Sequence, residues 1–369
     1  MSILRRVLAP LVILLWVVNV AGAAGKTENV IMITIDGMRW QDVFTGADPA
    51  LLNNYYGGVK DLEMTRGRFW RETAAARREA MMPFLWGVIA KQGQIFGDPE
   101  HRCDAMLTNG KKISYPGYSE MFCGFADPKI ETNDRIPNPN VNVLEWLNQK
   151  PSFKGRIAAY GTWDRLPFIL NTARSGLPCL AGWKPIEEEQ LSEGEREIND
   201  VVRDMTRLWH DNTFDVISGH ASIEYIKKHR PRVFYLMFGE TDEWAHFRRY
   251  DRYLESAQKN DEFIRRVWEM LQGMPQYAGK TSLILTTDHG RGSTVLDWID
   301  HNKKTVGAER IWMAVVGPDT PAMGVRSEVA VTQSQVAATV AGLLGEDFCA
   351  TSERVAKPLP GVVGSTEVK

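Results

Sequence analysis

The chain has 369 residues, 44% of them hydrophobic and 24% charged, and its formal net charge at pH 7 is −2. This composition is typical of a soluble globular protein and excludes a largely disordered chain or a repeat array. The slightly acidic balance disfavours nucleic acid as a partner, because a nucleic-acid-binding protein needs a basic surface. The length fits one large domain built around a single sheet, which we expect over residues 24–350.

Residues 1–23 have the pattern of a secretory signal peptide. Arg5 and Arg6 precede an apolar run over residues 7–20, and small residues at 21–23 supply a cleavage site. A transmembrane anchor is the alternative, but this run is shorter than the roughly 20 residues that cross a bilayer. We therefore predict an exported protein, periplasmic or secreted, that keeps no stable membrane anchor after cleavage.

Three apolar runs rich in β-branched and aromatic residues each lead to an acidic residue. Short runs of this kind, bounded by Gly and Asp, are typical of buried parallel strands. In a doubly wound sheet, ligands bind outside the carboxyl ends of such strands. The runs are residues 29–35, 233–238 and 282–287, and the acids are Asp36, Asp242 and Asp288.

Helical patterns separate these strands, with apolar spacings of three and four over residues 250–271 and 335–344. A further strand is expected at residues 156–160. The alternation predicts an α/β fold with a doubly wound, mostly parallel sheet flanked by helices. Residues 180–230 are acidic and helical, and form either a small inserted cap or ordinary crossover helices. Residues 351–369, with several prolines and glycines, are expected to be a flexible tail.

The acids at the strand ends are accompanied by histidines. Asp242 and His246 are four residues apart, so on a helix both side chains face one side and can bind one ion. Each such pair alone is weak evidence, but several carboxylates at one sheet edge repel one another unless divalent cations bind there. Mixed nitrogen and oxygen ligands suit Zn²⁺ best, with Mn²⁺ or Fe²⁺ as alternatives. The candidate ligands are Asp36, Asp242, His246, Asp288, His289 and His301.

A candidate nucleophile lies at a predicted helix start. Ser114 is followed by Tyr115-Pro116, and proline is favoured in the first turn of a helix. A helix N-terminus and a bound cation would both lower the pKa of a hydroxyl there. Two alternatives stay open: Ser114 only caps the helix, or Ser119, one turn later, is the reactive hydroxyl. Ser119 would point away from the positive end of the helix.

The ordered set of motifs resembles the alkaline phosphatase superfamily and, within it, the type I phosphodiesterase/nucleotide pyrophosphatase branch. That family has a strand ending in Asp-Gly, a Ser or Thr before x-Pro at a helix start, Asp-x-x-x-His, Asp-His-Gly and a last His. The resemblance spans residues 28–346. The corresponding motifs here are Asp36-Gly37, Ser114-Tyr115-Pro116, Asp242 to His246, Asp288-His289-Gly290 and His301.

The resemblance implies a two-metal phosphoric ester hydrolase that uses two divalent metal ions, Zn²⁺ above all. Ser114 would form a phosphoserine intermediate, which water then hydrolyses. The resemblance also implies how the ligands divide between the ions. One zinc would be held by Asp242, His246 and His301, and the other by Asp36, Asp288, His289 and the Ser114 oxygen.

Three further residues concern the substrate, which we predict to be a small-molecule phosphate ester. Asn133 matches the phosphate-binding asparagine of the family, although Asn138 and Asn140 lie close by in the sequence. Trp163 resembles a tryptophan of the phosphodiesterase relatives. Arg165 resembles one half of the Lys–Arg pair with which some monoesterase relatives hold the extra charge of a phosphate monoester. A phosphodiester is therefore the favoured substrate, and a phosphate monoester is the alternative.

Two more distant alternatives are a sulfatase and a non-catalytic metal-binding protein. Sulfatases modify a Cys or Ser in a motif that continues Pro-Ser/Ala-Arg, whereas here Pro116 is followed by Gly117-Tyr118. A degenerate binding protein would have no reason to keep Ser114 together with every expected ligand.

Four cysteines are spread along the chain. In an exported protein they allow up to two disulfides, in three full pairings, and their wide spacing disfavours a cysteine zinc site. They are Cys103, Cys123, Cys179 and Cys349.

Overall fold

The computed structural model describes residues 26–363. The predicted signal peptide, residues 1–23, lies outside the described residues, so export stays a prediction. Among the described helices, none combines the length and the apolar character needed to cross a bilayer.

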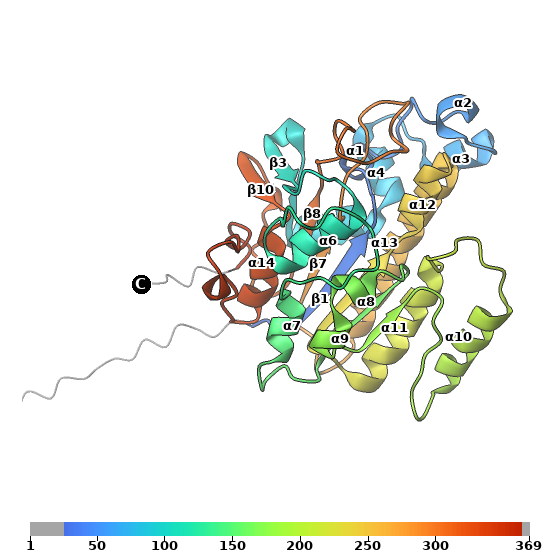
Figure 1. Ribbon diagram of the computed structural model, residues 1–369. Helices are drawn as coiled ribbons and strands as arrows, with labels where there is room; N and C mark the ends of the chain where they lie inside the picture. The colour runs from blue at the N-terminus through green and yellow to red at the C-terminus, as the bar shows by residue number, and fades with distance from the viewer. Residues whose placement is uncertain (1–25, 364–369) are drawn as a thin grey trace, which may run out of the picture.

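The strands within residues 26–363 form an eight-stranded sheet and a separate parallel pair (Figure 1). The order in the sheet is β5-β4-β6-β1-β7-β8-β2-β9, and β8 is antiparallel to both of its neighbours, β7 and β2. The other pairs are parallel. The strands are β1 (Asn29–Ile35), β2 (Gln94–Phe96), β3 (Cys103–Met106), β4 (Ile157–Gly161), β5 (Cys179–Ala181), β6 (Val233–Phe238), β7 (Thr281–Thr286), β8 (Met313–Val316), β9 (Gly324–Val325) and β10 (Val329–Thr332).

Helices cover both faces of this sheet. Alternate side chains of β1 explain why: Ile31 and Ile33 pack into one apolar cluster, whereas Val30 and Met32 pack into another. The α-helices are α1 (Trp40–Thr45), α2 (Asn54–Gly57), α3 (Leu62–Phe69), α4 (Ala74–Met81), α5 (Ala90–Gln92), α6 (Ser114–Cys123), α7 (Val143–Asn148), α8 (Leu166–Ile169), α9 (Thr172–Ser175), α10 (Glu193–Asp204), α11 (Asp215–His229), α12 (Glu240–His246), α13 (Tyr250–Gln272) and α14 (Gln335–Leu343). A π-helical turn at Leu85–Ile89 and 3₁₀ turns at Pro99–His101 and Cys349–Thr351 complete the list.

The predicted α/β fold is confirmed, with small shifts at element ends. Helices α11 and α13 cover the face of the sheet that carries Ile31, and α6, α7 and α14 cover the face that carries Val30. The strand expected at 282–287 is β7, one residue earlier, and the strand expected at 156–160 is β4, one residue later.

The segment 180–230 contains two main helices, α11 next to the sheet and α10 farther from it. Helix α11 packs against β4 and β6 as a crossover helix, and α10 packs on the outside of α11 (Figure 1). Helix α10 ends at Asp204, and its capping box joins Ser192 and Glu195. Whether this segment closes over a substrate stays a prediction.

The C-terminal segment differs from the flexible tail that was expected. Leu359 and Val362 are buried in the same cluster as α14, and the backbone N–H of Leu359 donates to Thr339 Oγ1 at 2.8 Å. Residues 352–363 therefore pack against the domain, because apolar side chains at intervals along this segment are buried there. All four cysteines lie within the described residues and are free, so the expected disulfides do not form in this structure.

Candidate active site

The carboxyl ends of three neighbouring strands bring the candidate ligands together. In the central sheet β1 lies between β6 and β7, and Ile35 is opposite Phe238 while Thr34 is opposite Thr286. The residues that follow these strands therefore leave the sheet at one edge. Two groups of three side chains form there, each with one ligand atom per residue within 4.8 Å of the others: Asp242, His246 and His301, and Asp36, Asp288 and His289.

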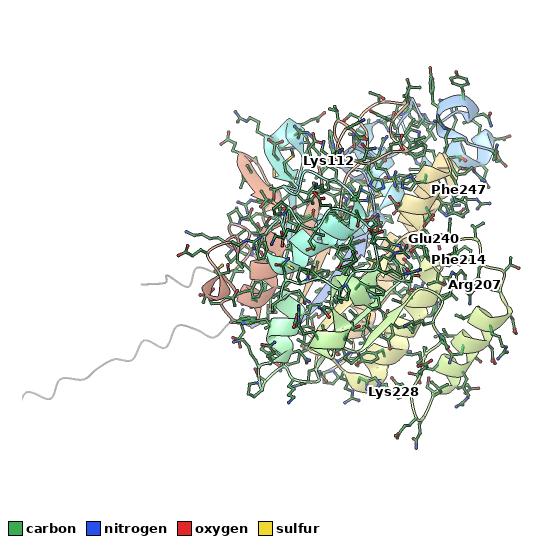
Figure 2. All side chains as sticks on the ribbon, in the orientation of Figure 1. Lys112, Arg207, Phe214, Lys228, Glu240 and Phe247 are labelled. Atoms are coloured by element: carbon green, nitrogen blue, oxygen red, sulfur yellow. The ribbon has the colours of Figure 1, made fainter. Side chains whose placement is uncertain are left out.

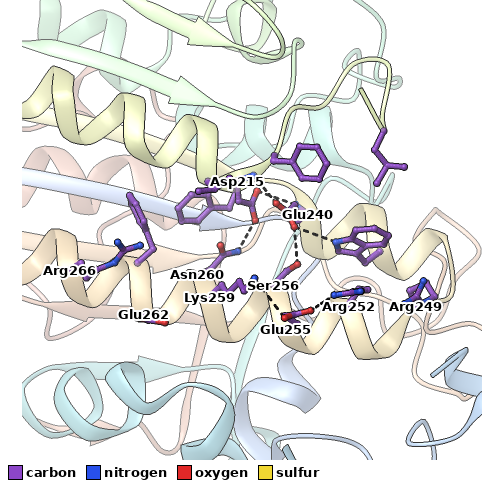
Figure 3. Close-up of a pocket in the computed structure, with 16 residues that line it drawn as sticks. Asp215, Glu240, Arg249, Arg252, Glu255, Ser256, Lys259, Asn260, Glu262 and Arg266 are labelled. Atoms are coloured by element: carbon purple, nitrogen blue, oxygen red, sulfur yellow. Dashed lines mark hydrogen bonds and ion pairs between the residues drawn. The ribbon is translucent and has the colours of Figure 1, made fainter. Parts of the chain in front are cut away.

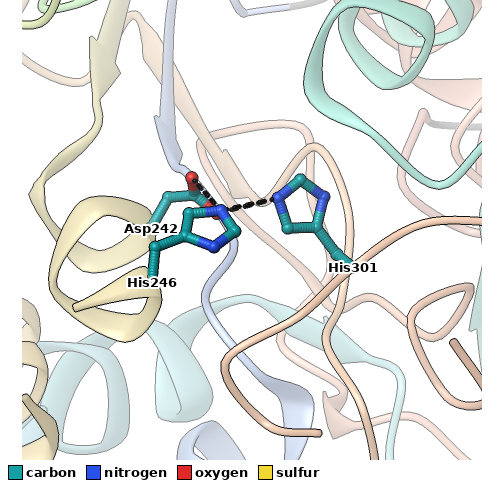
Figure 4. Close-up of side chains that lie close together, drawn as sticks. All are labelled: Asp242, His246 and His301. Atoms are coloured by element: carbon teal, nitrogen blue, oxygen red, sulfur yellow. Dashed lines mark hydrogen bonds and ion pairs between the residues drawn. The ribbon is translucent and has the colours of Figure 1, made fainter. Parts of the chain in front are cut away.

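The first ligand group joins helix α12 to a distant loop (Figure 4). Asp242 and His246 are one turn apart on α12, and Oδ2 of Asp242 lies 3.2 Å from Nε2 of His246. Nε2 of His301 lies 2.9 Å from Nε2 of His246 and 3.5 Å from Oδ1 of Asp242. Two imidazole nitrogens this close, beside a carboxylate, match the donor set of a divalent cation.

The second ligand group is buried, and two of its oxygens lack partners. Oδ1 of Asp36 and Oδ2 of Asp288 accept no hydrogen bond from any described residue. They lie 3.4 Å and 3.3 Å from Nε2 of His289. Burial raises the pKa of Asp36 well above its usual range, and the neighbouring carboxylates Asp288 and Asp242 raise it further. Burial also raises the pKa of Asp288. A cation would relieve both penalties, because it supplies the missing partner and the opposite charge.

Backbone carbonyls orient two of the imidazoles toward the ligand groups. Nδ1 of His289 donates to the carbonyl oxygen of Gly290 at 2.9 Å, and Nδ1 of His301 donates to that of Lys112 at 3.1 Å. Lys112, labelled in Figure 2, precedes helix α6 in the sequence. A proton held on Nδ1 leaves the lone pair of Nε2 for a metal ion. Burial and the neighbouring His289 hold the pKa of His301 well below its usual range, which keeps that imidazole neutral.

Ser114 is the first residue of α6, and its hydroxyl faces the second ligand group. Oγ of Ser114 lies 3.2 Å from Nε2 of His289. Ile113 occupies the N-cap position, so Ser114 does not cap the helix. The hydroxyl of Ser119 is buried inside the helix layer, where Nδ2 of Asn138 donates to it at 2.9 Å. Of the two candidate hydroxyls, the geometry thus brings Ser114 to the ligands and not Ser119.

The predicted substrate residues lie together beside the start of α6. The backbone N–H of Tyr115 donates to Oδ1 of Asn133 at 2.9 Å, and Nε of Arg165 donates to the carbonyl oxygen of Asn133 at 3.2 Å. The guanidinium of Arg165 lies over the ring of Trp163, 5.5 Å from its centroid. The two other asparagines have structural partners instead: Asn138 bonds within the α6 layer and Asn140 donates to Asp127.

Two residues that the sequence did not single out hold the ligands in place. Arg291 is fully buried, pairs with Asp242, and donates to the carbonyl oxygens of Gly37 at 3.1 Å and Ile299 at 2.7 Å. Burial raises the pKa of Asp242, but the Arg291 guanidinium together with His246 and His301 holds that pKa well below the usual range. The hydroxyl of Tyr118 donates to Oδ2 of Asp36 at 2.9 Å. Tyr118 lies one turn after Ser114 on α6, a spacing that could have suggested its role. A buried arginine gives no such signal.

A cavity outside the ligand groups lies along α12 and α13 (Figure 3). It measures about 690 Å³ and is lined by aromatic side chains and by residues of α13. Two of its acids, the buried Asp215 and the half-buried Glu240, already accept hydrogen bonds, among them Asn260 to Asp215 at 3.0 Å and Ser256 to Glu240 at 3.1 Å. Both of these carboxylates have partners, whereas Oδ1 of Asp36 and Oδ2 of Asp288 accept no hydrogen bond among the described residues, so we take the ligand groups as the candidate active site.

Comparisons with known proteins relate the chain to a family. The model of the Sulfatase family matches residues 114–346, more than half of the chain. No curated protein sequence matches the chain. The fold is similar to the phosphonate monoester hydrolase SpPMH from Silicibacter pomeroyi, with 13% identity over 93% of this chain and 78% of that one and a TM-score of 0.57. For the wild-type alkaline phosphatase PafA the identity is 11%, the coverage 92% and 99%, and the TM-score 0.56.

A 2-O GAG sulfatase is similar at 12% identity, over 93% of this chain and 76% of that one, with a TM-score of 0.53. At such identities the structural likeness shows a shared fold. The family match adds a sequence relation over a range that begins at Ser114 and includes His301. The chain therefore belongs to the Sulfatase family, within the alkaline phosphatase superfamily of metal-dependent hydrolases that act on sulfate or phosphate esters.

Proposed function

We propose that this protein is an exported phosphodiesterase that cleaves a small-molecule phosphate diester with Ser114 as the nucleophile. The observation that carries the proposal is the position of the Ser114 hydroxyl, at the start of α6 and 3.2 Å from Nε2 of His289. A hydroxyl beside a cluster of metal-ligand atoms and a helix N-terminus is activated for attack.

The two ligand groups fit two divalent cations. One would be held by Asp242, His246 and His301, and the other by Asp36, Asp288 and His289 with the Ser114 oxygen. When bound, such ions neutralise the carboxylates, favour the serine alkoxide and stabilise charge on the phosphoryl oxygens. Mixed nitrogen and oxygen ligands suit Zn²⁺ best.

The reaction of the chain itself begins at Ser114. Its Oγ forms a bond to phosphorus while the bond from phosphorus to the leaving alcohol oxygen breaks, in line with the attack. A water molecule then replaces the Ser114 oxygen and releases a phosphate monoester. Asn133 is fixed beside this turn because its Oδ1 accepts from Tyr115, and its amide NH₂ group is available to a phosphoryl oxygen.

The charge around Arg165 supports a diester rather than a monoester. At neutral pH a phosphate monoester carries more negative charge than a diester, and Arg165 is the residue that would hold the excess. Arg165 is already paired with Asp211 and with Asp164, and Asp164 is shared with Arg135. Little positive potential remains for a second phosphate charge. The alternative function, a phosphomonoesterase, rests on the presence of Arg165 itself.

The contact of α6 with the end of β7 disfavours a sulfatase. A Cβ atom added at Gly117 would lie 2.3 Å from the carbonyl oxygen of Asp288. The Ser or Ala of the sulfatase motif at this position would therefore force α6 away from the metal ligands. The next position carries Tyr118, which donates to Asp36, where that motif has an arginine.

We expect Gly117→Ala to lower kcat/KM by about 100-fold, because displacing α6 by even an ångström misplaces both Ser114 and Asp288. Stability should fall by about 1–3 kcal/mol through overpacking. Gly67→Ala is the matched control: it lies on exposed α3, where an added Cβ meets nothing within 4 Å. That control should keep full activity and a Tm at or above that of the wild type. Full activity of Gly117→Ala would show that the close approach does not matter.

The most direct test of the proposed function compares three substrates of equal leaving group: a bis-nitrophenyl phosphate diester, a nitrophenyl phosphate and a nitrophenyl sulfate. The metal-loaded enzyme should show its highest kcat/KM on the diester. A higher value on the monoester or the sulfate would replace the proposal with that activity. No turnover of any of the three would favour a binding protein.

A further inference from the structure

Residues 205–214, between α10 and α11, reach the substrate side of the active site. Asn212 and Trp163 form an antiparallel bridge, which ties the segment to the end of β4. Trp209 packs edge-on against Trp244 of α12, with ring centroids 5.1 Å apart. These contacts hold the segment against two elements that carry active-site residues.

Asp211, in this segment, pairs with the guanidinium of Arg165. Its Oδ2 lies 3.0 Å from Nη1 of Arg165 and accepts from Nε1 of Trp163 at 3.4 Å. Asp164 is the other carboxylate beside Arg165, but it also binds Arg135 at 2.5 Å. Asp211 is thus the partner that Arg165 does not share with a second guanidinium.

Arg165 is connected in turn to the nucleophile helix. Its Nε donates to the carbonyl oxygen of Asn133, and Oδ1 of Asn133 accepts from the backbone N–H of Tyr115, the residue after Ser114. Two hydrogen bonds therefore separate the Arg165 guanidinium from the start of α6. The charge of Arg165 would therefore act on a phosphoryl group bound at Ser114, with partial screening by solvent.

We infer that Asp211 is a specificity-determining residue, which disfavours phosphate monoesters relative to diesters by neutralising Arg165. The inference rests on the proposed phosphodiesterase function. A monoester dianion needs one more positive charge than a diester monoanion. Asp211 neutralises the positive charge of Arg165 that a monoester would need. It lies in a segment outside the motifs that carry the candidate metal ligands.

The test is Asp211→Asn, which removes the charge and keeps an oxygen that accepts from Trp163. We expect the ratio of kcat/KM on the nitrophenyl monoester to that on the diester to rise by about tenfold, the effect of one partly screened charge. Adding Arg165→Gln to Asp211→Asn should abolish the gain, because the effect passes through Arg165. Asp204→Asn, exposed at the end of α10, is the matched control and should leave the ratio unchanged.

Inorganic phosphate supplies a readout that does not depend on turnover. Calorimetry on the metal-loaded protein should show about tenfold tighter phosphate binding to Asp211→Asn than to the wild type. The inference would be overturned if Asp211→Asn and the wild type bound phosphate equally well. It would also be overturned if the folded variant kept the wild-type ratio of kcat/KM on monoester to diester, or if the rise in that ratio persisted after Arg165→Gln. Failure of the wild type on all phosphate esters would instead overturn the proposed function, while phosphate binding still decides the role of Asp211.

Discussion

Replacing Ser114 by alanine is expected to lower kcat/KM on the diester by at least about 10³-fold, because Ser119, the rival hydroxyl of α6, lies away from the ligand groups. Oγ of Ser114 faces Nε2 of His289, and the substitution removes only that oxygen. The metal content of the variant should stay close to that of the wild type, since the carboxylates and imidazoles supply the other ligands. Stopped assays of the variant and metal analysis of the same sample measure both quantities.

Ser119→Ala is the matched control for this experiment. Its hydroxyl lies on the same helix but accepts from Asn138 in a buried layer. We expect unchanged turnover and a loss of stability of about 1 kcal/mol from the missing hydrogen bond. Turnover that survives Ser114→Ala and falls in Ser119→Ala would move the nucleophile one turn along α6. Turnover that survives both would assign the attack to a water molecule.

Removing metal ions should abolish activity and lower the Tm by about 5–10 °C. Without cations, Oδ1 of Asp36 and Oδ2 of Asp288 have no hydrogen-bond partner among the described residues, and the carboxylates repel one another. Metal analysis after mild purification should find about two ions per chain, and refilling with Zn²⁺, Mn²⁺ or Mg²⁺ should identify the ion that restores activity. A metal content near zero, with an unchanged Tm after chelation, would contradict the two-ion site.

A pair of histidine variants separates the metal site from general effects of losing a histidine. His301→Ala removes a ligand from the first group and should lower the bound metal by about one ion per chain. His220→Ala is the matched control, because His220 is an exposed residue of α11 and belongs to neither ligand group. It should keep both ions and full activity. Equal metal loss in the two variants would show that His301 is not a ligand.

Much of the site could be predicted because its parts follow from local patterns. The acids Asp36 and Asp288 come directly after buried strands, and parallel strands end at one edge of a sheet, so their convergence follows from the pattern alone. The pair Asp242 and His246 needs only one helical turn to face one ion. Element ends were less predictable, as the one-residue shifts of β4 and β7 show, because packing and hydrogen bonding decide them.

The amino-acid sequence by itself determined the fold class, the order of the candidate ligands and the serine at a helix start, since each depends on residues that are close in the chain. Only the tertiary structure decided what neutralises and positions them. Arg291 reaches the carbonyl of Gly37 across 254 positions, and Asp211 reaches Arg165 from a different segment. The periodicity of apolar residues does not predict such contacts, because they depend on which loops the packed sheet brings side by side.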